Sequence, residues 1–308
     1  MKKVFIDGSA GTTGLRIFER LSARADLELI TLTGDARKDP EARKQALNAC
    51  DIAFLCLPDA AAMESVSLIE NENVTVLDTS TAHRTNADWT YGFPEIVGAE
   101  KVKAAKRIAV PGCHASGFIS LVAPLVQNGV LAPSARLTCH SITGYSGGGK
   151  KMIAEYEAGD RDKLLDAPRQ YGLTQQHKHL KEMKAICGLE NAPIFCPIVS
   201  DFYSGMVVTV PLFKEDLAPG KTVDDIKAVL AKQYTGPMVT YKETMDEGGL
   251  MSGAGLSGKD TMEVTVCGNE DRILLIARYD NLGKGASGAA VQCLNLVLGV
   301  DITTGLEL

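Results

Sequence analysis

One glycine-rich segment constrains the fold of this 308-residue chain more than any other, Gly8-Ser9-Ala10-Gly11-Thr12-Thr13-Gly14. It follows a short apolar run, Lys3–Asp7, and precedes a helical pattern that continues to Leu21. Glycines at this spacing allow a tight turn and let a ligand approach the N–H groups at the start of a helix. The segment predicts a dinucleotide-binding domain, with pyrophosphate on the loop and hydroxyl donors from Ser9, Thr12 and Thr13. The alternative is a structural turn that binds no ligand.

The first hundred residues alternate strand and helix patterns. Strands are predicted at Lys3–Asp7, Leu27–Leu32, Ile52–Leu57, Val74–Leu77 and Ile108–Val110. Helices are predicted between them, including Pro40–Ala49 and Ala60–Ile69. Strands and helices that alternate at this spacing are typical of a doubly wound parallel sheet, the Rossmann type of α/β fold.

The second half of the chain has a different pattern. Strands are predicted at Ala135–Ser141, Ile194–Ile198, Met206–Leu212, Thr261–Cys267 and Arg272–Tyr279. Helices are predicted at Lys150–Ala158, His179–Cys187, Val223–Gln233 and Ala286–Leu298. This order predicts an α+β domain with an antiparallel or mixed sheet. A chain of 308 residues is long enough for two such domains.

The segment after the second predicted strand bears on the choice of dinucleotide. In NAD-binding proteins an acidic residue commonly follows this strand and bonds the ribose 2′-hydroxyl. Here Thr33, Arg37 and Lys38 could hold a 2′-phosphate, whereas Asp35 argues for the hydroxyl. We expect NADP, used as NADPH. A solvated helix start would also explain Arg37 and Lys38.

Composition narrows the expected partners and compartment. The net charge is −6 and basic residues form no run, so nucleic acid is not expected as a partner. No apolar stretch approaches the length of a transmembrane helix, and the first residues lack a signal-peptide pattern. We therefore expect no membrane association and a cytoplasmic location. The eight cysteines form no CxxC pair and are expected to be free thiols.

Cys113 differs from the other seven cysteines in its setting. Val110-Pro111-Gly112-Cys113 follows the fifth predicted strand and precedes an apolar helical stretch that begins at Phe118. Because the Pro-Gly pair forces a turn, Cys113 should lie near the N-terminus of this helix, where the helix dipole stabilises a thiolate. A thiolate is a strong nucleophile toward an acyl carbon. We predict that Cys113 is a catalytic nucleophile, with a packed core cysteine as the alternative.

A reactive cysteine needs a base, and the five histidines are His83, His114, His140, His177 and His179. His114 adjoins the nucleophile, but sequence neighbours often point apart. His177 and His179 lie at a predicted helix start and are the better candidates for general acid–base catalysis. They could also bind a metal as an H-x-H pair. No third ligand lies at a suitable spacing, so no metal is expected.

Five motifs between Asp78 and Gly288 carry a resemblance to a known family. They are Asp78-Thr79-Ser80-Thr81-Ala82-His83-Arg84, Tyr91-Gly92-Phe93-Pro94-Glu95, Pro111-Gly112-Cys113, Thr143-Gly144-Tyr145-Ser146-Gly147-Gly148-Gly149 and Asn281-Leu282-Gly283-Lys284-Gly285-Ala286-Ser287-Gly288. In these segments the chain resembles the shorter branch of the N-acetyl-γ-glutamyl-phosphate reductases, enzymes of arginine biosynthesis. Three positions depart from the family pattern: Val110 replaces Asn, His114 replaces Tyr, and Leu180-Lys181-Glu182 replaces a helix start with Pro and acids. These departures concern substrate contacts rather than the thioester chemistry.

The resemblance implies a dinucleotide-binding domain, residues 1–112 with the C-terminal helix 284–308 packed back on it, and a catalytic and dimerisation domain, residues 113–283. This fold is shared with semialdehyde and glyceraldehyde-phosphate dehydrogenases and is usually dimeric or tetrameric. The site residues that the resemblance implies are the nucleophile Cys113, the acid–base residue His177 with His179 in reserve, substrate-binding Arg84, Thr143 and Gly147, and cofactor-binding Asn281 and Lys284.

The implied activity is NADPH-dependent reduction of N-acetyl-L-glutamyl 5-phosphate to the 5-semialdehyde and phosphate, through a thioester on Cys113. Another acyl-phosphate or semialdehyde dehydrogenase, of the aspartate or aminoadipate type, is the first alternative. The Tyr-Gly-Phe-Pro-Glu and Pro-Gly-Cys segments favour the acetylglutamyl substrate over it. The second alternative is a dinucleotide-binding regulator in which Cys113 is structural.

Overall fold

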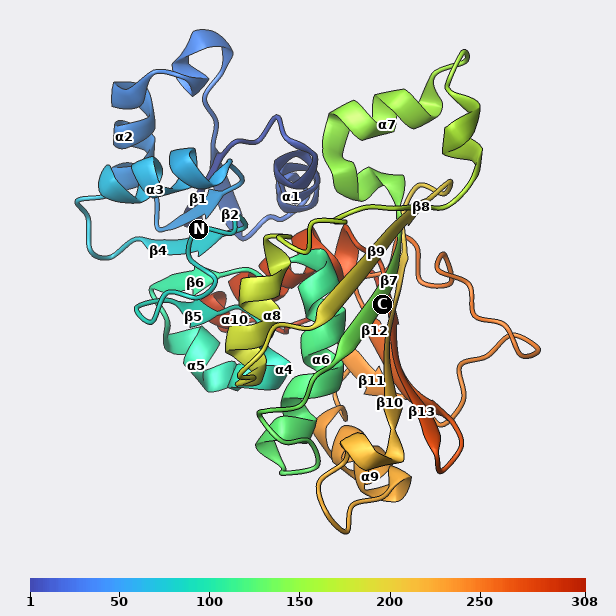
Figure 1. Ribbon diagram of the computed structural model, residues 1–308. Coiled ribbons are helices and arrows are strands. Elements are labelled where there is room, and N and C mark those ends of the chain that lie inside the picture. Colours follow the sequence, from blue (N-terminus) through green and yellow to red (C-terminus); the bar gives the residue numbers. More distant parts are fainter. The chain divides into compact units, whose positions relative to one another are not determined.

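The computed structural model describes residues 1–308, and the chain divides into two compact units (Figure 1). The first unit consists of Met1–Pro111 and Ala286–Leu306, and the second of Gly112–Gly285 and Glu307–Leu308. Each unit is built on one β-sheet with helices packed against it. The predicted fold class, a parallel Rossmann sheet followed by an α+β domain, is confirmed by the two sheets described below.

The sheet of the first unit has the strand order β2-β1-β3-β4-β6-β5, and all its neighbours are parallel. Its strands are β1 (Lys2–Asp7), β2 (Leu27–Ile30), β3 (Ile52–Leu55), β4 (Thr75–Asp78), β5 (Thr90–Tyr91) and β6 (Arg107–Ala109). Its helices are α1 (Thr12–Ser22), α2 (Pro40–Ala49), α3 (Asp59–Ser67), α4 (Pro94–Val97), α5 (Ala99–Ala104) and α10 (Gly288–Leu298).

Helices cover both faces of this sheet. Val4 and Ile6 of β1 pack in one cluster with residues of α1 and α10, whereas Phe5 packs on the other face with residues of α2 and α3. Strands β3 and β4 are buried along their whole length. Continuous burial is expected of parallel strands that are covered on both sides. The helix near the C-terminus is therefore part of the core of the first unit.

The sheet of the second unit is mixed, with the order β11-β12-β13-β10-β7-β9-β8. Its strands are β7 (Thr138–Gly144), β8 (Arg169–Gln170), β9 (Ile194–Ser200), β10 (Met206–Phe213), β11 (Val239–Tyr241), β12 (Met262–Gly268) and β13 (Arg272–Tyr279). Its helices are α6 (Cys113–Gln127), α7 (Gly149–Glu157), α8 (His179–Cys187) and α9 (Val223–Gln233). Helix α6 packs on β10 and β13, with α8 and α9 beside it, so these helices cover one face (Figure 1).

The differences from the sequence prediction concern short or irregular elements. Strands β5 and β8 have two residues each and β11 has three, which is too short for a periodic pattern. The strand predicted from Ala135 begins at Thr138. A π-helical turn, Gly283–Ser287, precedes α10, where we expected a regular helix from Ala286. None of the helices is both long enough and apolar enough to cross a membrane.

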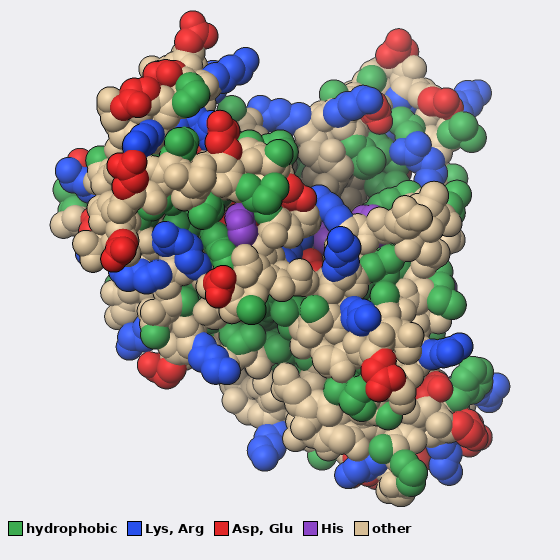
Figure 2. Space-filling view, turned by 60° about the vertical axis from the view of Figure 1, so that its left-hand side comes forward, with side chains coloured by type: hydrophobic (Ala, Val, Ile, Leu, Met, Phe, Trp, Pro, Cys, Tyr) green, Lys and Arg blue, Asp and Glu red, His purple; other side chains and the backbone are tan.

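On the face drawn in Figure 2, basic and acidic side chains are interspersed rather than gathered into large patches of one sign.

A buried ion pair lies at the end of β1. Nη2 of Arg43 on α2 is 3.1 Å from Oδ2 of Asp7, and their side chains are 8% and 4% exposed. Ser65 on α3 donates its hydroxyl to the same Asp7 oxygen at 2.8 Å and accepts a hydrogen bond from Nη2 of Arg43 at 2.6 Å. The three groups join β1, α2 and α3 beneath the glycine-rich loop, which begins at Gly8.

We predict that Arg43→Met lowers the free energy of unfolding of the first unit by about 3–5 kcal/mol, because it leaves the buried Asp7 carboxylate without its cationic partner and with the Ser65 hydroxyl as a donor. The neighbouring change Lys44→Met is the control, since its partner Glu70 is 71% exposed and the loss of a solvated ion pair should cost much less stability. Urea denaturation followed by fluorescence of Trp89, the one tryptophan of the chain, reports on this unit. Equal costs for the two variants would contradict a stabilising role for the buried pair.

Candidate active site

The glycine-rich loop joins β1 to α1, and two of its glycines are required by the protein itself. A Cβ at Gly8, where φ is +88°, would lie 2.3 Å from the carbonyl oxygen of Cys56. A Cβ at Gly14 would lie 2.3 Å from the carbonyl oxygen of Gly8. At Gly11, the residue before α1, a Cβ would meet nothing closer than 3.5 Å. The protein itself therefore leaves room for a side chain at this third glycine, and its contact with a ligand stays a prediction.

A cavity of about 430 Å³ adjoins the loop within the first unit. Ser9 lines it together with Arg37 and Lys38, whereas Thr33 lies outside the lining. Asp7 is the acidic residue in the lining, and its carboxylate is already bonded to Arg43 and Ser65. Arg43 also lines the cavity, which therefore presents three basic side chains, one of them paired with Asp7, and the start of the glycine-rich loop to a ligand.

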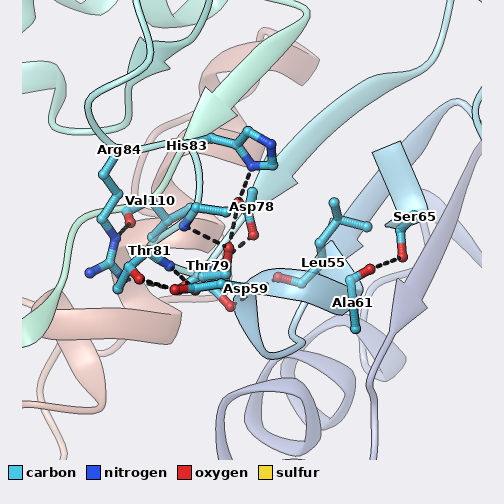
Figure 3. Close-up of polar contacts among 12 residues, drawn as sticks. Leu55, Asp59, Ala61, Ser65, Asp78, Thr79, Thr81, His83, Arg84 and Val110 are labelled. Carbon is cyan, nitrogen blue, oxygen red and sulfur yellow. Dashed lines mark hydrogen bonds and ion pairs between the residues drawn. The ribbon is translucent and has the colours of Figure 1, made fainter. Parts of the chain in front are cut away.

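Figure 3 shows how the segment after β4 is held in the first unit. The carboxylate of Asp78 accepts hydrogen bonds from the N–H and the hydroxyl of Ser80, and one of its oxygens lies 2.6 Å from Nδ1 of His83. The carboxylate of Asp59, at the start of α3, accepts hydrogen bonds from the N–H and the hydroxyl of Thr81. Two carboxylates therefore fix this short loop.

Arg84 ends this loop and is buried, with 7% of its surface exposed. Its Nε donates to the carbonyl oxygen of Val110 at 2.9 Å, and its Nη2 donates to that of Thr79 at 2.9 Å (Figure 3). Val110 is three residues before Cys113 in the chain. Arg84 therefore fixes the end of the segment that leads to the predicted nucleophile, and its contact with substrate stays a prediction.

Cys113 is the first residue of α6 in the second unit and is half-buried. The N–H of Gly112 donates to Oε1 of Glu182, a buried residue of α8, at 2.8 Å. The hydroxyl of Tyr279 on β13 bridges the first turn of α6, donating to the carbonyl oxygen of Cys113 at 2.5 Å and accepting from the N–H of Gly117 at 3.0 Å. Groups from α8 and β13 thus hold the turn that carries the thiol.

Four of the other seven cysteines have thiols whose pKa is raised by burial. Burial raises the pKa of the Cys50 and Cys56 thiols to about 12. Burial also raises the pKa of Cys139 and Cys187, so all four thiols stay protonated at neutral pH. A buried neutral thiol behaves as a small apolar side chain rather than as a nucleophile.

The rings of His177 and His179 lie beside the ring of His114, the residue that follows Cys113. The ring centroids are 4.8 Å apart for His177 and His179, 5.6 Å for His114 and His179, and 6.0 Å for His114 and His177. Burial lowers the pKa of His177, so its ring is neutral at pH 7. Its Nδ1 accepts the N–H of His179 at 3.3 Å, which favours the tautomer with the proton on Nε2. His83 belongs to the first unit, and His140 is exposed on β7.

Residues predicted to bind substrate and cofactor meet beside the end of β7. A Cβ at Gly147 would lie 3.4 Å from Nδ2 of Asn281 and 3.7 Å from Oγ1 of Thr143. Asn281 donates from Nδ2 to Ser146 at 3.0 Å and accepts the N–H of Gly205 at 2.8 Å. Lys284, in the π-helical turn, is 2% exposed. The two predicted substrate residues and Asn281 therefore form one group in the second unit.

Four residues that shape this site were not singled out from the sequence. They are Glu182 and Tyr279, which bond to the first turn of α6, and Ser141 and Tyr171, whose hydroxyl oxygens each lie 2.6 Å from a ring nitrogen of His114. Glu182 could have been found by its spacing, because it lies three residues after His179 and shares its face of α8. Tyr171 precedes the His177 segment and has no local signal that relates it to His114. The two others lie on strands distant in sequence, and only the order of the sheet brings them to α6.

Comparison with known proteins relates both units to semialdehyde dehydrogenases. The family described as "Semialdehyde dehydrogenase, NAD binding domain" matches residues 3–105, and "Semialdehyde dehydrogenase, dimerisation domain" matches residues 113–281. The crystal structure of aspartate semialdehyde dehydrogenase II from Vibrio cholerae has a TM-score of 0.70 at 15% identity, and covers 97% of this chain and 98% of that one. The enzyme from Francisella tularensis has a TM-score of 0.72 at 14% identity, covering 97% and 100%. At such identities these structures show a shared fold alone.

Relatives that are more similar in sequence carry one name. N-acetyl-gamma-glutamyl-phosphate reductase of Sinorhizobium medicae is 44% identical over 305 residues, which cover 96% of this chain and 98% of the relative. The reductase of Rhizobium etli is 46% identical with the same coverage. Reductase 2 of a Nostoc strain is 42% identical over 318 residues and covers 99% of both chains. The resemblance seen in the motifs is confirmed, and the chain belongs to the N-acetyl-gamma-glutamyl-phosphate reductase family of semialdehyde dehydrogenases.

Proposed function

We propose that this protein reduces N-acetyl-L-glutamyl 5-phosphate to N-acetyl-L-glutamate 5-semialdehyde and phosphate, with NADPH as the reductant and a thioester on Cys113. The observation that carries the proposal is a half-buried cysteine at the first position of α6, next to a cluster of histidines that includes neutral His177. The names of relatives that match over nearly the whole chain support the substrate. We place the reaction in the cytoplasm, because free thiols such as the eight here persist in a reducing compartment.

The proposed reaction begins when the Cys113 thiolate attacks the γ-acyl carbon. A C–S bond forms, the C–O bond to phosphate breaks, and phosphate leaves with the bonding electrons. NADPH, when bound, supplies the hydride that reduces the thioester carbon. The C–S bond then breaks, Cys113 leaves as a thiolate, and the semialdehyde is released. The N–H groups in the first turn of α6 stabilise the negative oxygen formed at each addition.

We assign the proton steps to His177, with His179 as the alternative. A neutral imidazole can take up the thiol proton, and the protonated ring can donate to the oxygen of the intermediate. Among the substrate-binding residues, the planar guanidinium of Arg84 suits a carboxylate or a phosphate. Thr143 and Gly147 lie close together near the end of β7, and we propose that they contact the substrate there.

We further propose that the cofactor is NADP rather than NAD. Arg37 and Lys38 line the cavity beside the glycine-rich loop, and the nearby Asp7 is paired with Arg43. Cationic side chains in this place suit the 2′-phosphate that distinguishes NADP. The pyrophosphate would lie on the loop, and the other contacts that we propose are Thr33, Asn281 and Lys284.

We propose that the protein is a homodimer, or a homotetramer built from such dimers, formed through the sheet of the second unit. Helices cover one face of this sheet (Figure 1). The register places Ile142, Ile194, Phe213 and Leu274 together on the opposite face, where they are 39%, 61%, 62% and 39% exposed. Large apolar side chains exposed on a sheet face that no helix covers commonly mark an interface, and a second copy of the same face would cover them with two-fold symmetry.

The first prediction from this function concerns the nucleophile. With N-acetylglutamate semialdehyde and phosphate, the wild type should reduce NADP⁺, and Cys113→Ala should lower the rate by at least about 10⁴-fold while NADPH binding is retained. Cys196→Ala, on β9, is the control and should keep full activity. Activity in Cys113→Ala would exclude the thioester. A wild type that oxidises aspartate semialdehyde instead would keep the chemistry and change the substrate.

The second prediction concerns the choice of cofactor. The double variant Arg37→Ala/Lys38→Ala should raise the Kd for NADPH by about 10- to 100-fold, because it removes charged contacts to the 2′-phosphate, and should leave the Kd for NADH unchanged. Lys44→Ala on α2 is the control for a general loss of positive charge. Isothermal titration gives both constants, and equal changes for the two dinucleotides would contradict the assignment.

The third prediction concerns the open face of the second sheet. Leu274→Arg should convert the dimer into monomers, because a buried unpaired charge at a two-fold interface is repeated on both sides. Leu164→Arg is the control, since Leu164 is 71% exposed and lies outside the sheet. Light scattering after size-exclusion chromatography measures the mass of each. A monomeric wild type, or a Leu274→Arg variant that stays dimeric, would exclude this interface.

A further inference from the structure

His114 directly follows Cys113, the proposed nucleophile, in the chain. Its ring is buried, and each nitrogen lies 2.6 Å from a hydroxyl: Nδ1 from Oγ of Ser141 on β7, and Nε2 from the phenol oxygen of Tyr171. Burial, and secondly the charge of His177, lower the pKa of His114 to about 3. The ring is therefore neutral at pH 7, and it donates through one nitrogen and accepts through the other.

Ser141 determines which nitrogen carries the proton. Its side chain is 0% exposed, and Nδ1 of His114 is the hydrogen-bond partner of its hydroxyl. A buried O–H group that finds no acceptor costs free energy, so Ser141 donates to Nδ1. The proton of His114 then lies on Nε2 and is donated to the oxygen of Tyr171. Because that oxygen accepts, the phenol proton of Tyr171 is directed away from His114.

Tyr171 is joined to the nucleophile's segment through His114, which follows Cys113 in the chain and whose Nε2 lies 2.6 Å from the phenol oxygen. Burial raises the pKa of this phenol, and the negative charge of Cys113 raises it further, so Tyr171 is a protonated donor at neutral pH. The residue is half-buried and its ring centroid is 5.9 Å from that of His177. Because Tyr171 bonds to the residue that follows Cys113 in the chain, its neutral O–H is placed to reach an oxygen of a group attached to the sulfur.

We propose that Ser141, His114 and Tyr171 form a hydrogen-bond relay that presents the Tyr171 O–H as a donor to the acyl oxygen of the group bound to Cys113. The inference rests on the proposed function in one respect, that Cys113 carries an acyl group. Negative charge develops on this oxygen whenever a nucleophile adds to the acyl carbon. A donor that is fixed beforehand stabilises this charge without reorganisation, and no proton needs to be transferred. Ser141 and His114 are positioning residues.

Four other titratable residues lie around this relay, and none of them replaces a hydroxyl partner of His114. His177 and His179 contact the ring of His114 at centroid distances of 6.0 and 5.6 Å, while both of its nitrogens bond to hydroxyls. Glu182 accepts the N–H of Gly112, and Tyr279 donates to the carbonyl oxygen of Cys113. The donor at Tyr171 is therefore additional to the acid–base role of His177.

The test uses p-nitrophenyl acetate, which acylates a reactive thiol through an oxyanion and does not depend on the natural substrate. Release of p-nitrophenol is followed by absorbance, with Cys113→Ala as the blank. Tyr171→Phe keeps the ring and removes the donor, so it should slow acylation by about a hundredfold. Tyr241→Phe, whose exposed hydroxyl faces Glu243, is the matched control and should react as the wild type does.

The relay itself is tested by the coupling between its members. Ser141→Ala lets the ring proton of His114 move to Nδ1. Nε2 then accepts the phenol proton of Tyr171, which is no longer available to the acyl oxygen. Acylation should therefore slow, though less than in Tyr171→Phe. In the Tyr171→Phe background the same change should alter the rate by no more than about twofold. His114→Gln, whose amide can donate to Tyr171, should retain more of the rate than His114→Leu.

Alkylation of Cys113 by iodoacetamide forms no oxyanion and should be unchanged in Tyr171→Phe, which separates oxyanion stabilisation from damage to the nucleophile. Wild-type acylation in Tyr171→Phe would overturn the inference. The inference would also be overturned if Ser141→Ala slowed acylation as much in the Tyr171→Phe background as in the wild type. It would equally be overturned if Tyr171→Phe slowed alkylation by iodoacetamide as much as it slows acylation. If the ester results are as expected but the wild type does not use N-acetylglutamate semialdehyde, the relay stands and the proposed substrate is wrong.

Discussion

The first turn of α6, where we propose that the chemistry occurs, is fixed in place by the core of the second unit. The helix begins at Cys113, and every residue from His114 to Leu125 is buried. A helix enclosed in this way cannot slide or rotate without opening a close-packed core. Glu182 from α8 and Tyr279 from β13 bond to the backbone of the turn, so the position of the thiol depends on the second unit as a whole.

The same burial sets the protonation states around the thiol. It lowers the pKa of His114 and His177 and so keeps both rings neutral, and it raises the pKa of cysteines elsewhere in the chain. Neutral imidazoles can donate and accept hydrogen bonds at pH 7, whereas buried neutral thiols cannot compete as nucleophiles. One physical effect, the desolvation of charge, therefore supports acid–base chemistry at one place and suppresses thiol reactivity at others.

How much of the molecule can be predicted from its sequence depends on whether the signal is local. Pro40–Ala49 was predicted end to end, because Asp39 caps the helix and Pro40 occupies its first turn. The position of Cys113 at a helix start follows in the same way from the Pro-Gly pair before it. Strands of two or three residues, such as β8, have no period to detect.

Contacts between distant segments are the part that the sequence does not reveal. Ser141 and Tyr279 both reach α6 because β7 and β13 flank β10 in the sheet, and no local pattern marks that order. For Arg84 the sequence could not predict the binding partner, because a guanidinium can bond backbone carbonyl oxygens as well as substrate anions. The structure shows its bonds to the carbonyls of Thr79 and Val110, which the motif alone did not indicate.

The central claim is that Cys113 carries the acyl group during the reaction. The most direct measurement is mass spectrometry of the wild type after incubation with N-acetyl-L-glutamyl 5-phosphate in the absence of NADPH, acid quenching and proteolysis. We predict an acetylglutamyl group on the peptide that contains Cys113, released by hydroxylamine as expected of a thioester. An unmodified Cys113 in a preparation that turns over when NADPH is added would contradict the account.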